Sequence, residues 1–477
     1  MSPEAEQRAL ERAFRYADER TGGASVARRV LRYVFPDHWS FLFGEIALYS
    51  FVVLVGTGVF LTFFFDPSLQ RTVYDGPYTL LQGREVSAAY DSVMSLSFEV
   101  DAGLLMRQTH HWAALVFVAA IVVHLMRVFF TGAFRKPREL TYYIGLAMLM
   151  LALLEGFAGY SLGDDLLSGM GLAIAYGVAL SFPVIGGGFA FLVWGGQFPG
   201  ADDFISRLFI GHVLILPVAI AVLLSLHLLL VAVPHHTQFG GERQTERNVV
   251  GTRLWPGYAL RSIGLLLAVA GALFLMGGLV QINPVWQWGP YEPYAATNGA
   301  QPDWYMGWLI GALRIMPPLE PTIGDYTLVP NPFWGGALVP MAVFAFLFAW
   351  PSIERWRTDN SGEHNLLDRP RDNPWRTAVG AALFTFVALI FLAGSADRIF
   401  VTFGIPYEAQ VWFFRAAVLI APPLVYLLTK RLCTELRDSG WHPFRGGRTA
   451  RVRRAGSGGF VVDGEVPVED DASGADR

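Results

Sequence analysis

The chain has 477 residues, of which 53% are hydrophobic and 14% aromatic, while only 16% are charged. A soluble core of this size does not need repeated apolar runs of eighteen or more residues, so the composition excludes a soluble enzyme and predicts a polytopic membrane protein. The net charge of −4 carries little information, because the position of each charge matters more in a membrane protein. A single cysteine, Cys433, excludes an intrachain disulfide, a cysteine zinc cluster and a Cys-x-x-Cys-His haem attachment.

The apolar runs predict an all-α membrane protein with eight transmembrane helices. We expect these helices at residues 41–65, 108–130, 141–162, 208–233, 258–280, 333–350, 376–394 and 411–428. The segments that precede, connect and follow them place 29 lysine and arginine residues on one side of the membrane and 6 on the other. Because basic segments stay in the cytoplasm, both termini of this multi-pass protein are predicted to be cytoplasmic.

This helix pattern divides the chain into four parts. Residues 1–40 form a cytoplasmic N-terminal segment, and residues 41–257 contain the first four helices with the loop that follows them. Residues 258–435 contain the last four helices. Residues 436–477 form a cytoplasmic tail, whose content of Gly, Arg and Asp predicts disorder.

One apolar segment is not counted as a span. A ninth helix between residues 171 and 196 would move the arginine-rich segments after residue 233 to the wrong side. We therefore expect Leu166–Phe198 to form short helices on the outer surface, interrupted by Pro183 and the glycines at 186–188. With the loop at 281–332, which is rich in Pro, Trp and Tyr, these helices would cover an apolar pocket or docking surface.

Paired histidines organise the second and fourth predicted helices. His110 and His124 are 14 residues apart, which at ~1.5 Å per residue places them ~21 Å apart on nearly one helix face. His212 and His227 repeat this arrangement at a spacing of 15. Since both helices run from outside to inside, His110 and His212 share an outer level and His124 and His227 an inner one. One such histidine is also compatible with a helix-to-helix hydrogen bond, but four at matching spacings favour two stacked planar metal cofactors.

Two neutral imidazoles on opposite sides of a planar iron cofactor leave no open coordination position, which suits electron transfer. Zinc would need a clustered, tetrahedral ligand set that this spacing does not provide. His111 is a rival for His110, but a spacing of 13 would rotate it off the His124 face. We interpret His111 as a neighbour of the site or a surface residue.

Glycines and arginines accompany the histidines. Gly44 and Gly58 in the first helix, and Gly145 and Gly159 in the third, are each 14 residues apart. Close helix packing is the alternative for any one of them, yet the match to the histidine period favours flat macrocycle edges lying against both helices. Arg107 and Arg127 each lie three residues from a histidine and nearer the membrane surface. Their side chains either pair with haem propionates or extend to lipid headgroups.

The sequence resembles cytochrome b of the cytochrome bc quinol oxidoreductases over about residues 35–435, and within that family the actinobacterial branch. The motifs that carry this resemblance are the two glycine pairs, Arg107-x-x-His110, His124-x-x-Arg127, the His212 and His227 pair with Pro217 between them, Gly159-Tyr160, Pro302-Asp303-Trp304-Tyr305 and the stretch from Glu363 to Pro370. The resemblance implies a di-haem bundle formed by the first four helices, with two non-covalent b-type haems of bis-histidine ligation.

The resemblance also implies a quinol pocket on the outer side, near the Pro302–Tyr305 turn. Most relatives have glutamate where this chain has Asp303, which is one methylene shorter. Independently of the family, Asp303 is a carboxylate in an apolar outer loop that can accept a quinol proton, with helix capping as the alternative role. Tyr305 and Tyr160 would shape the same pocket, for which plain aromatic packing is the alternative.

The inner side departs from the family. Where relatives often have an acid in the segment that opens the fifth helix, this chain has Ser262. The histidine usually found soon after the inner ligand is replaced by apolar residues at 231 and 232. His235 and His236 either substitute as proton donors or lie on the cytoplasmic surface. The proton path of the inner quinone site is therefore left open by the sequence.

The activity implied is that of a respiratory quinol:cytochrome c oxidoreductase. Quinol would be oxidised at the outer site, with one electron passing to an iron-sulfur partner and one through the haems to an inner quinone site, coupled to proton translocation. One cysteine cannot ligate an iron-sulfur cluster or a c-type haem, so a Rieske-type subunit and a c-type cytochrome subunit are required. The resemblance further implies menaquinone, a homodimer in the plasma membrane and no nucleic acid, and is compatible with a supercomplex with cytochrome c oxidase.

Two other functional classes fit part of the pattern. A di-haem membrane anchor of a dehydrogenase or hydrogenase would move electrons without splitting them, but it needs only four or five helices. The four helices after residue 258 and the Pro302–Asp303 turn argue against that class. A transporter with histidines in its proton path predicts no haem.

Overall fold

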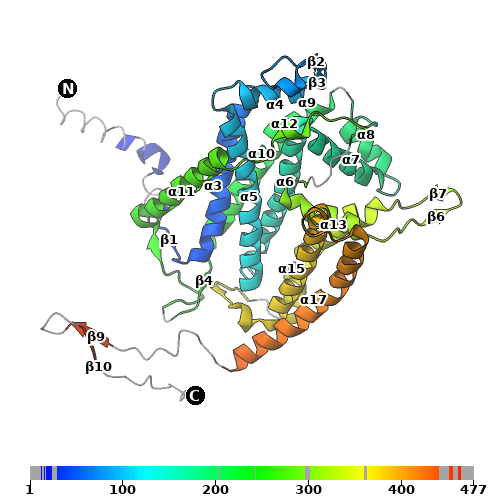
Figure 1. Cartoon of the computed structure of the whole chain (residues 1–477). Helices are drawn as coiled ribbons and strands as arrows, with labels where there is room; N and C mark the ends of the chain where they lie inside the picture. Colours follow the sequence, from blue (N-terminus) through cyan, green and yellow to red (C-terminus); the bar gives the residue numbers. More distant parts are fainter. Residues whose placement is uncertain are drawn as a thin grey trace.

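The computed structural model describes residues 30–439 except 202, 242, 296–300 and 359–361, together with 12, 15–16, 18–23, 451–454 and 460–463. Long helices form a bundle, with short helices and two-stranded pairs at its two ends (Figure 1). We name these the His110 end and the His124 end, because the two histidines lie near the start and the finish of one helix. Helix α4 (Ala88–Phe98) and strands β2 (Arg71–Val73) and β3 (Glu85–Ser87) lie at the His110 end, and β4 (Gln238–Phe239) at the His124 end (Figure 1).

Eight helices in the described residues are long and apolar enough to cross a membrane, which confirms the predicted number. They are α3 (Leu42–Thr62), α5 (Gly103–Thr131), α6 (Glu139–Tyr160), the continuous helix Phe204–Ala232 that ends in α10 (Leu216–Ala232), α11 (Ala259–Leu279), α14 (Val339–Thr358), α15 (Pro374–Gly394) and α17 (Tyr407–Asp438). Helix α17 continues past its predicted end at residue 428. Charged residues that ended the apolar pattern there form helical contacts instead, such as the pair between Arg431 Nε and Glu435 Oε1 at 2.8 Å.

The predicted surface helices between the third and fourth spans are also confirmed. They are α7 (Leu166–Leu180) and α8 (Gly186–Trp194), both too short to cross the ~30 Å hydrocarbon core. Asp165 caps α7, because its Oδ1 accepts hydrogen bonds from the backbone N–H groups of the next turn. The chain turns between the two helices at Pro183, as the sequence predicts.

Further short elements complete the His110 end. Tyr90 Oη on α4 donates a hydrogen bond of 3.2 Å to the carbonyl of Val285 on α12, which joins two distant parts of the chain. The elements of this end are α4 (Ala88–Phe98), α9 (Phe204–Ile210), α12 (Val285–Trp288), α13 (Gly307–Ile315), α16 (Ala396–Phe403), and the antiparallel pairs β2 (Arg71–Val73) with β3 (Glu85–Ser87) and β6 (Thr322–Ile323) with β7 (Tyr326–Thr327).

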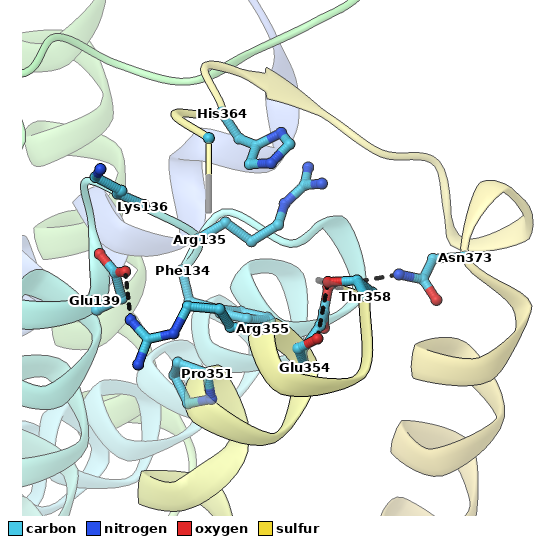
Figure 2. A pocket seen from close by; sticks show the side chains of 11 residues that line it. Phe134, Arg135, Lys136, Glu139, Pro351, Glu354, Arg355, Thr358, His364 and Asn373 are labelled. Atoms are coloured by element: carbon cyan, nitrogen blue, oxygen red, sulfur yellow. Dashed lines mark hydrogen bonds and ion pairs between the residues drawn. The ribbon is translucent and has the colours of Figure 1, made fainter. Parts of the chain in front are cut away.

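Buried charges join the helices at the His124 end. Arg376 is fully buried, and its guanidinium donates to Glu354 Oε1 at 2.7 Å and to Asp368 Oδ2 at 2.6 Å. Arg135, in the turn after α5, reaches the other oxygen of Asp368 at 3.0 Å. A cavity of about 70 Å³ lies beside this cluster (Figure 2). The pairs at this end are β1 (Val34–Phe35) with β5 (Thr252–Arg253) and the parallel β4 (Gln238–Phe239) with β8 (Leu366–Leu367).

The terminal segments lie largely outside the described residues. This applies to most of residues 1–40 and to the tail after 439, so the predicted disorder of that tail is not tested. Residues 451–454 and 460–463 pair as the antiparallel strands β9 and β10. The division at residue 257 stays a prediction, and helices cross it, since α11 packs on α3 and α5.

Asp164, in the link between α6 and α7, combines a left-handed backbone with a buried carboxyl group. Its backbone is left-handed, with φ of 46°, and its Oδ2 accepts a hydrogen bond of 2.5 Å from Ser87 Oγ. Burial raises the pKa of the Asp164 carboxyl to about 6, against the lowering effects of Ser87 and Arg71. Near neutral pH the fold therefore contains a carboxylate in a place that favours the neutral acid.

We predict that Asp164→Asn stabilises the fold at high pH only. The unfolded carboxyl has a pKa of ~3.9, so the stabilisation from its raised folded pKa is complete below about pH 4 and is lost as the pH rises through 6. Asparagine has no charge and tolerates the left-handed backbone. Thermal unfolding should show a gain of about 3 kcal/mol at pH 8 and little change at pH 4. An equal gain at both values would contradict this account.

Candidate functional site

The four predicted glycines lie directly against the four predicted histidines. The two glycines of α3 face the histidines of α5. The two glycines of α6 face His227 on α10 and His212 in the turn that precedes α10. A Cβ atom would lie 3.2 Å from His124 Cε1 at Gly44, 3.2 Å from His110 Cε1 at Gly58, 3.6 Å from His227 Cε1 at Gly145, and closer still to His212 at Gly159. Any larger residue would therefore fill the space beside an imidazole.

His110 and His212 meet at one level, as the sequence predicts. Their ring centroids are 6.1 Å apart and the ring planes are inclined by 79°. His110 Nδ1 is 3.0 Å from Thr57 Oγ1, and His212 Nδ1 is 3.0 Å from Glu155 Oε1. A polar partner on Nδ1 fixes the orientation of a histidine ring and leaves Nε2 as the nitrogen available to a metal.

A local irregularity sets the position of His212. Residues Gly211–Ile215 form a π-helical stretch between α9 and α10, and Pro217 follows in the first turn of α10. Proline has no backbone N–H and cannot complete the regular hydrogen-bond pattern of the preceding turn. π-Helical turns of this kind often occur at functional sites, because they shift the direction of the side chains that follow.

Buried polar atoms around both levels have no hydrogen-bond partner among the described residues. They are Nδ1 of His124 and of His227, and Nε and Nη2 of both Arg107 and Arg127. Buried polar groups are normally paired, so six such atoms call for a missing partner. Arg107 uses one nitrogen to reach the Asn283 carbonyl at 3.1 Å, and Arg127 lies over the Phe41 ring at 4.3 Å. The free nitrogens fit an anionic group bound next to each pair of histidines.

One cavity of about 610 Å³ connects the His110 level with the predicted quinol residues. This volume is typical of a site for a small organic molecule. Most of its surface is apolar, and its polar members come from five separate parts of the chain. These members include Arg107, His110, His111, Glu155, Tyr160, Asp165, His212, Asp303 and Tyr305.

Asp303 is paired with His111 in this cavity. The distance from Asp303 Oδ1 to His111 Nε2 is 2.7 Å, and both side chains are almost buried. Asp303 precedes the helical turn Trp304–Met306, but its side chain makes no capping hydrogen bond, so the capping alternative is not the conformation adopted. His111 thus faces the predicted quinol region, because it is rotated by about 100° from His110 on the same helix.

The two predicted tyrosines also line the cavity. Tyr305 is 2% exposed, and its hydroxyl lies so close to Gly156 on α6 that a Cβ atom there would be 2.7 Å away. Burial and then the charge of Asp303 raise the pKa of Tyr305 well above its usual value, which keeps this phenol protonated. Tyr160 has a buried hydroxyl without a partner among the described residues, and its ring centroid is 6.2 Å from that of His111.

Two acids of the cavity were missed by sequence reasoning. Glu155 contacts His212, and the signal for it was an acid inside an apolar span. Asp165 is fully buried, and its Oδ2 has no partner among the described residues. Sequence reasoning had no signal that singled out Asp165.

The two histidines after the fourth span differ from each other. His235 is exposed, in keeping with the surface interpretation. His236 packs against Phe35, with ring centroids 4.8 Å apart. Burial, followed by the positive charges of Arg127 and Arg138, lowers the pKa of His236 to about 4. At neutral pH this imidazole therefore carries no proton to donate as a cation.

Comparisons with known proteins agree with this geometry. A family model described as "Cytochrome b(N-terminal)/b6/petB" matches residues 115–290. In fold, the chain is similar to a subunit of a structure titled "Hyperthermophilic respiratory Complex III", with a TM-score of 0.65 over 87% of this chain and 99% of that one, at 19% identity.

Similar sequences cover nearly the whole chain. The chain is 48% identical to the cytochrome bc1 complex cytochrome b subunit of Mycobacterium bovis, over 93% of this chain and 81% of that protein. It is 46% identical to the subunit of the same name in Corynebacterium diphtheriae, over 93% and 82%. For Streptomyces coelicolor the identity is 43%, over 94% and 83%. The chain therefore belongs to the family of cytochrome b subunits of cytochrome bc1 complexes, within the group found in actinobacteria.

Proposed function

We propose that this membrane protein oxidises quinol at the His110 end and passes the two electrons along separate routes, with coupled proton translocation. One observation supports this most strongly: four imidazoles lie against four glycines on two levels, and unpartnered arginine nitrogens accompany them. A cavity of about 610 Å³ that is lined by an acid adjoins the His110 level. This arrangement fits a protein with a site for quinol oxidation beside a path for electrons away from it.

Members of this family bind b-type haem, and the residues fit two of them. His110 with His212 would ligate the outer haem, and His124 with His227 the inner one. The glycines on α3 and α6 leave room for the macrocycle edges, while Arg107 and Arg127 would donate hydrogen bonds to propionates. When bound, two bis-histidine haems would carry single electrons from one end of the bundle to the other.

The residues of the cavity perform the proton chemistry. A quinol must lose two protons with its two electrons, and Asp303 is a carboxylate beside the space where a quinol hydroxyl would bind. His111 holds this carboxylate toward the cavity through its 2.7 Å contact. Tyr305 and Tyr160 present protonated hydroxyls that orient the ring, and the apolar walls exclude water.

Partner subunits take the electron that leaves the chain. A Rieske-type iron-sulfur subunit and a c-type cytochrome subunit fit the single cysteine, and assembly as a homodimer and with cytochrome c oxidase fits the family. In each of the spans Phe204–Ala232 and Tyr407–Asp438, only 6% of the most apolar 18-residue stretch is buried inside the protein. These spans therefore offer wide faces to lipid or to other chains. We propose a plasma-membrane location, cytoplasmic termini and menaquinol as the substrate.

The glycine arrangement predicts a haem-specific defect. Gly58→Val should prevent binding of the outer haem, because its side chain would occupy the space beside His110. Gly56 lies on the same helix, and a Cβ there meets nothing within 4 Å. Gly56→Val is therefore the matched control and should keep both haems. Haem content and reduced-minus-oxidised spectra measure the difference, and two wild-type haems in Gly58→Val would contradict the assignment.

The contact of Glu155 with His212 predicts a change in redox potential. A carboxylate on Nδ1 makes the imidazole a stronger donor to iron, so Glu155→Gln should raise the midpoint potential of the outer haem only. The scale is tens of millivolts, since ~59 mV corresponds to a tenfold change for a one-electron couple. A redox titration resolves the two haems. Equal shifts in both, or none, would rule out this coupling.

Replacing the acid of the cavity should slow the reaction without loss of cofactor. Asp303→Asn keeps the size of the side chain but accepts no proton, so quinol oxidation should fall by about 10²-fold. Asp303→Glu keeps a carboxylate and should retain most activity. Steady-state assays with quinol measure both variants, and spectra check that both haems remain. Unchanged turnover in Asp303→Asn would exclude this residue as the proton acceptor.

A further inference from the structure

We propose that Glu45, on the first spanning helix, is the acid that delivers protons to quinone at the inner site. This inference rests on the proposed function, because it requires an inner quinone site at the His124 end. The sequence has Ser262 where an acid of the fifth span is often found in the family. The structure supplies a carboxylate at this place from a different helix.

Glu45 stands alone as a charge in its helix. Helix α3 has no other charged residue between Leu42 and Thr62. The preceding residue, Gly44, lies against His124, and one residue corresponds to a rotation of about 100° on a helix. The Glu45 side chain therefore points away from the histidine and toward α11. An ionisable residue in an apolar span is costly to retain, which makes a functional role the default reading.

Three hydroxyl groups surround the Glu45 carboxylate. Tyr258 Oη donates to Oε1 at 2.6 Å, and Ser262 Oγ donates to Oε2 at 2.7 Å. Tyr49 Oη lies 3.3 Å from Oε2 and is also hydrogen-bonded to Ser262. Hydroxyls can donate to a carboxylate and accept from a carboxylic acid. The site thus accommodates Glu45 in both protonation states.

The absence of a cation distinguishes this acid from a structural one. Among the described residues, Glu45 makes no ion pair, whereas Glu354 is held by Arg376 at 2.7 Å. The ion pair with Arg376 links α14 to α15, so Glu354 is suited to joining helices. No cation holds Glu45 in this way in the described part of the chain. Its titratable neighbours are the phenols of Tyr49 and Tyr258.

The surroundings allow both quinone and protons to reach the site. Exposed apolar side chains flank the α3 and α11 helices at this end, among them Trp39, Leu42 and Ile263. A quinone ring can approach between them from the lipid. On the aqueous side, Arg261 directly precedes Ser262 in the chain. Its exposed side chain contacts Asp37 at 2.8 Å.

The proposed step is balanced for two successive electrons. Quinone takes up two electrons one at a time, which the haem that His124 and His227 would hold would supply. With each electron, the O–H bond of protonated Glu45 breaks and a new O–H bond forms on a quinone oxygen. Water on the same side then returns a proton to the carboxylate. Two cycles convert one quinone to one quinol.

His236 is the rival donor at this end. It lies among aromatic rings, and its pKa is lowered to about 4, so the imidazole is neutral at physiological pH. Passing a proton through it would first require formation of an imidazolium beside Arg127 and Arg138, whose charges oppose this. Glu45 has no such positive neighbour within ion-pair distance in the described part of the chain.

The test isolates the inner site in the purified complex. With the outer site blocked by an inhibitor, added menaquinol reduces the inner haem only by reverse reaction at the inner site. Glu45→Gln keeps the size and hydrogen bonding of the side chain but cannot take up or release a proton. The rate of this haem reduction should therefore fall by about 10²-fold. Redox-induced infrared spectra should also lose a carboxyl band in Glu45→Gln. Glu139→Gln, which removes another acid of the His124 end that pairs with Arg355 and not with Glu45, should retain both the rate and the band.

A double variant tests whether the location of the acid matters more than the helix that carries it. Glu45→Ser combined with Ser262→Glu moves the carboxylate to α11 and should recover much of the rate lost in Glu45→Ser alone. A wild-type rate in Glu45→Gln, with both haems present, would overturn the role of Glu45 and leave the inner site intact. No haem reduction in the wild-type complex would instead overturn the inner site itself, and the proposed function with it.

Discussion

The structure depends on one steric constraint, which is the space kept open between glycine and histidine on two levels of the bundle. A Cβ at Gly159 would overlap the imidazole of His212. A Cβ at Gly44 or Gly58 would press on an imidazole at 3.2 Å, and one at Gly145 would contact His227 at 3.6 Å. The unpartnered nitrogens of Arg107 and Arg127 complete the same arrangement. Helix packing, usually a matter of filling space, is here organised around space that must remain for a cofactor.

Acids inside the bundle divide into two kinds by their partners. Glu354 is neutralised by the fully buried Arg376 and stabilises the contact between α14 and α15. Glu155, Asp303 and Glu45 instead contact imidazoles or hydroxyls and lie next to the proposed cofactor and quinone positions. Buried carboxylates without a cation are expensive, so their retention supports roles in redox or proton chemistry.

The sequence predicted the eight spans, the surface helices and the facing of glycines and histidines, because these follow from hydropathy and helical period. It missed contacts that depend on how helices are rotated against each other. His111 was set aside by its spacing from His124, yet it reaches Asp303 across 192 residues. The contact of Glu45 with Ser262 joins helices 217 residues apart and has no periodic signature. The end of α17 was missed for a different reason, since charged i,i+4 pairs extend a helix beyond its apolar part.

Neighbouring residues in one helix repeatedly face different parts of the proposed site. His110 and His111 do so on α5, Gly159 and Tyr160 on α6, and Gly44 and Glu45 on α3. Consecutive residues of a helix point about 100° apart, so the helical backbone directs one residue toward the proposed cofactor and the next toward the groups of the proposed proton chemistry. Insertion or deletion of a single residue would rotate the rest of such a helix by about 100° and move both kinds of side chain out of position together. Evolution can therefore change the side chains of this protein more freely than the lengths of its first, second and third membrane helices.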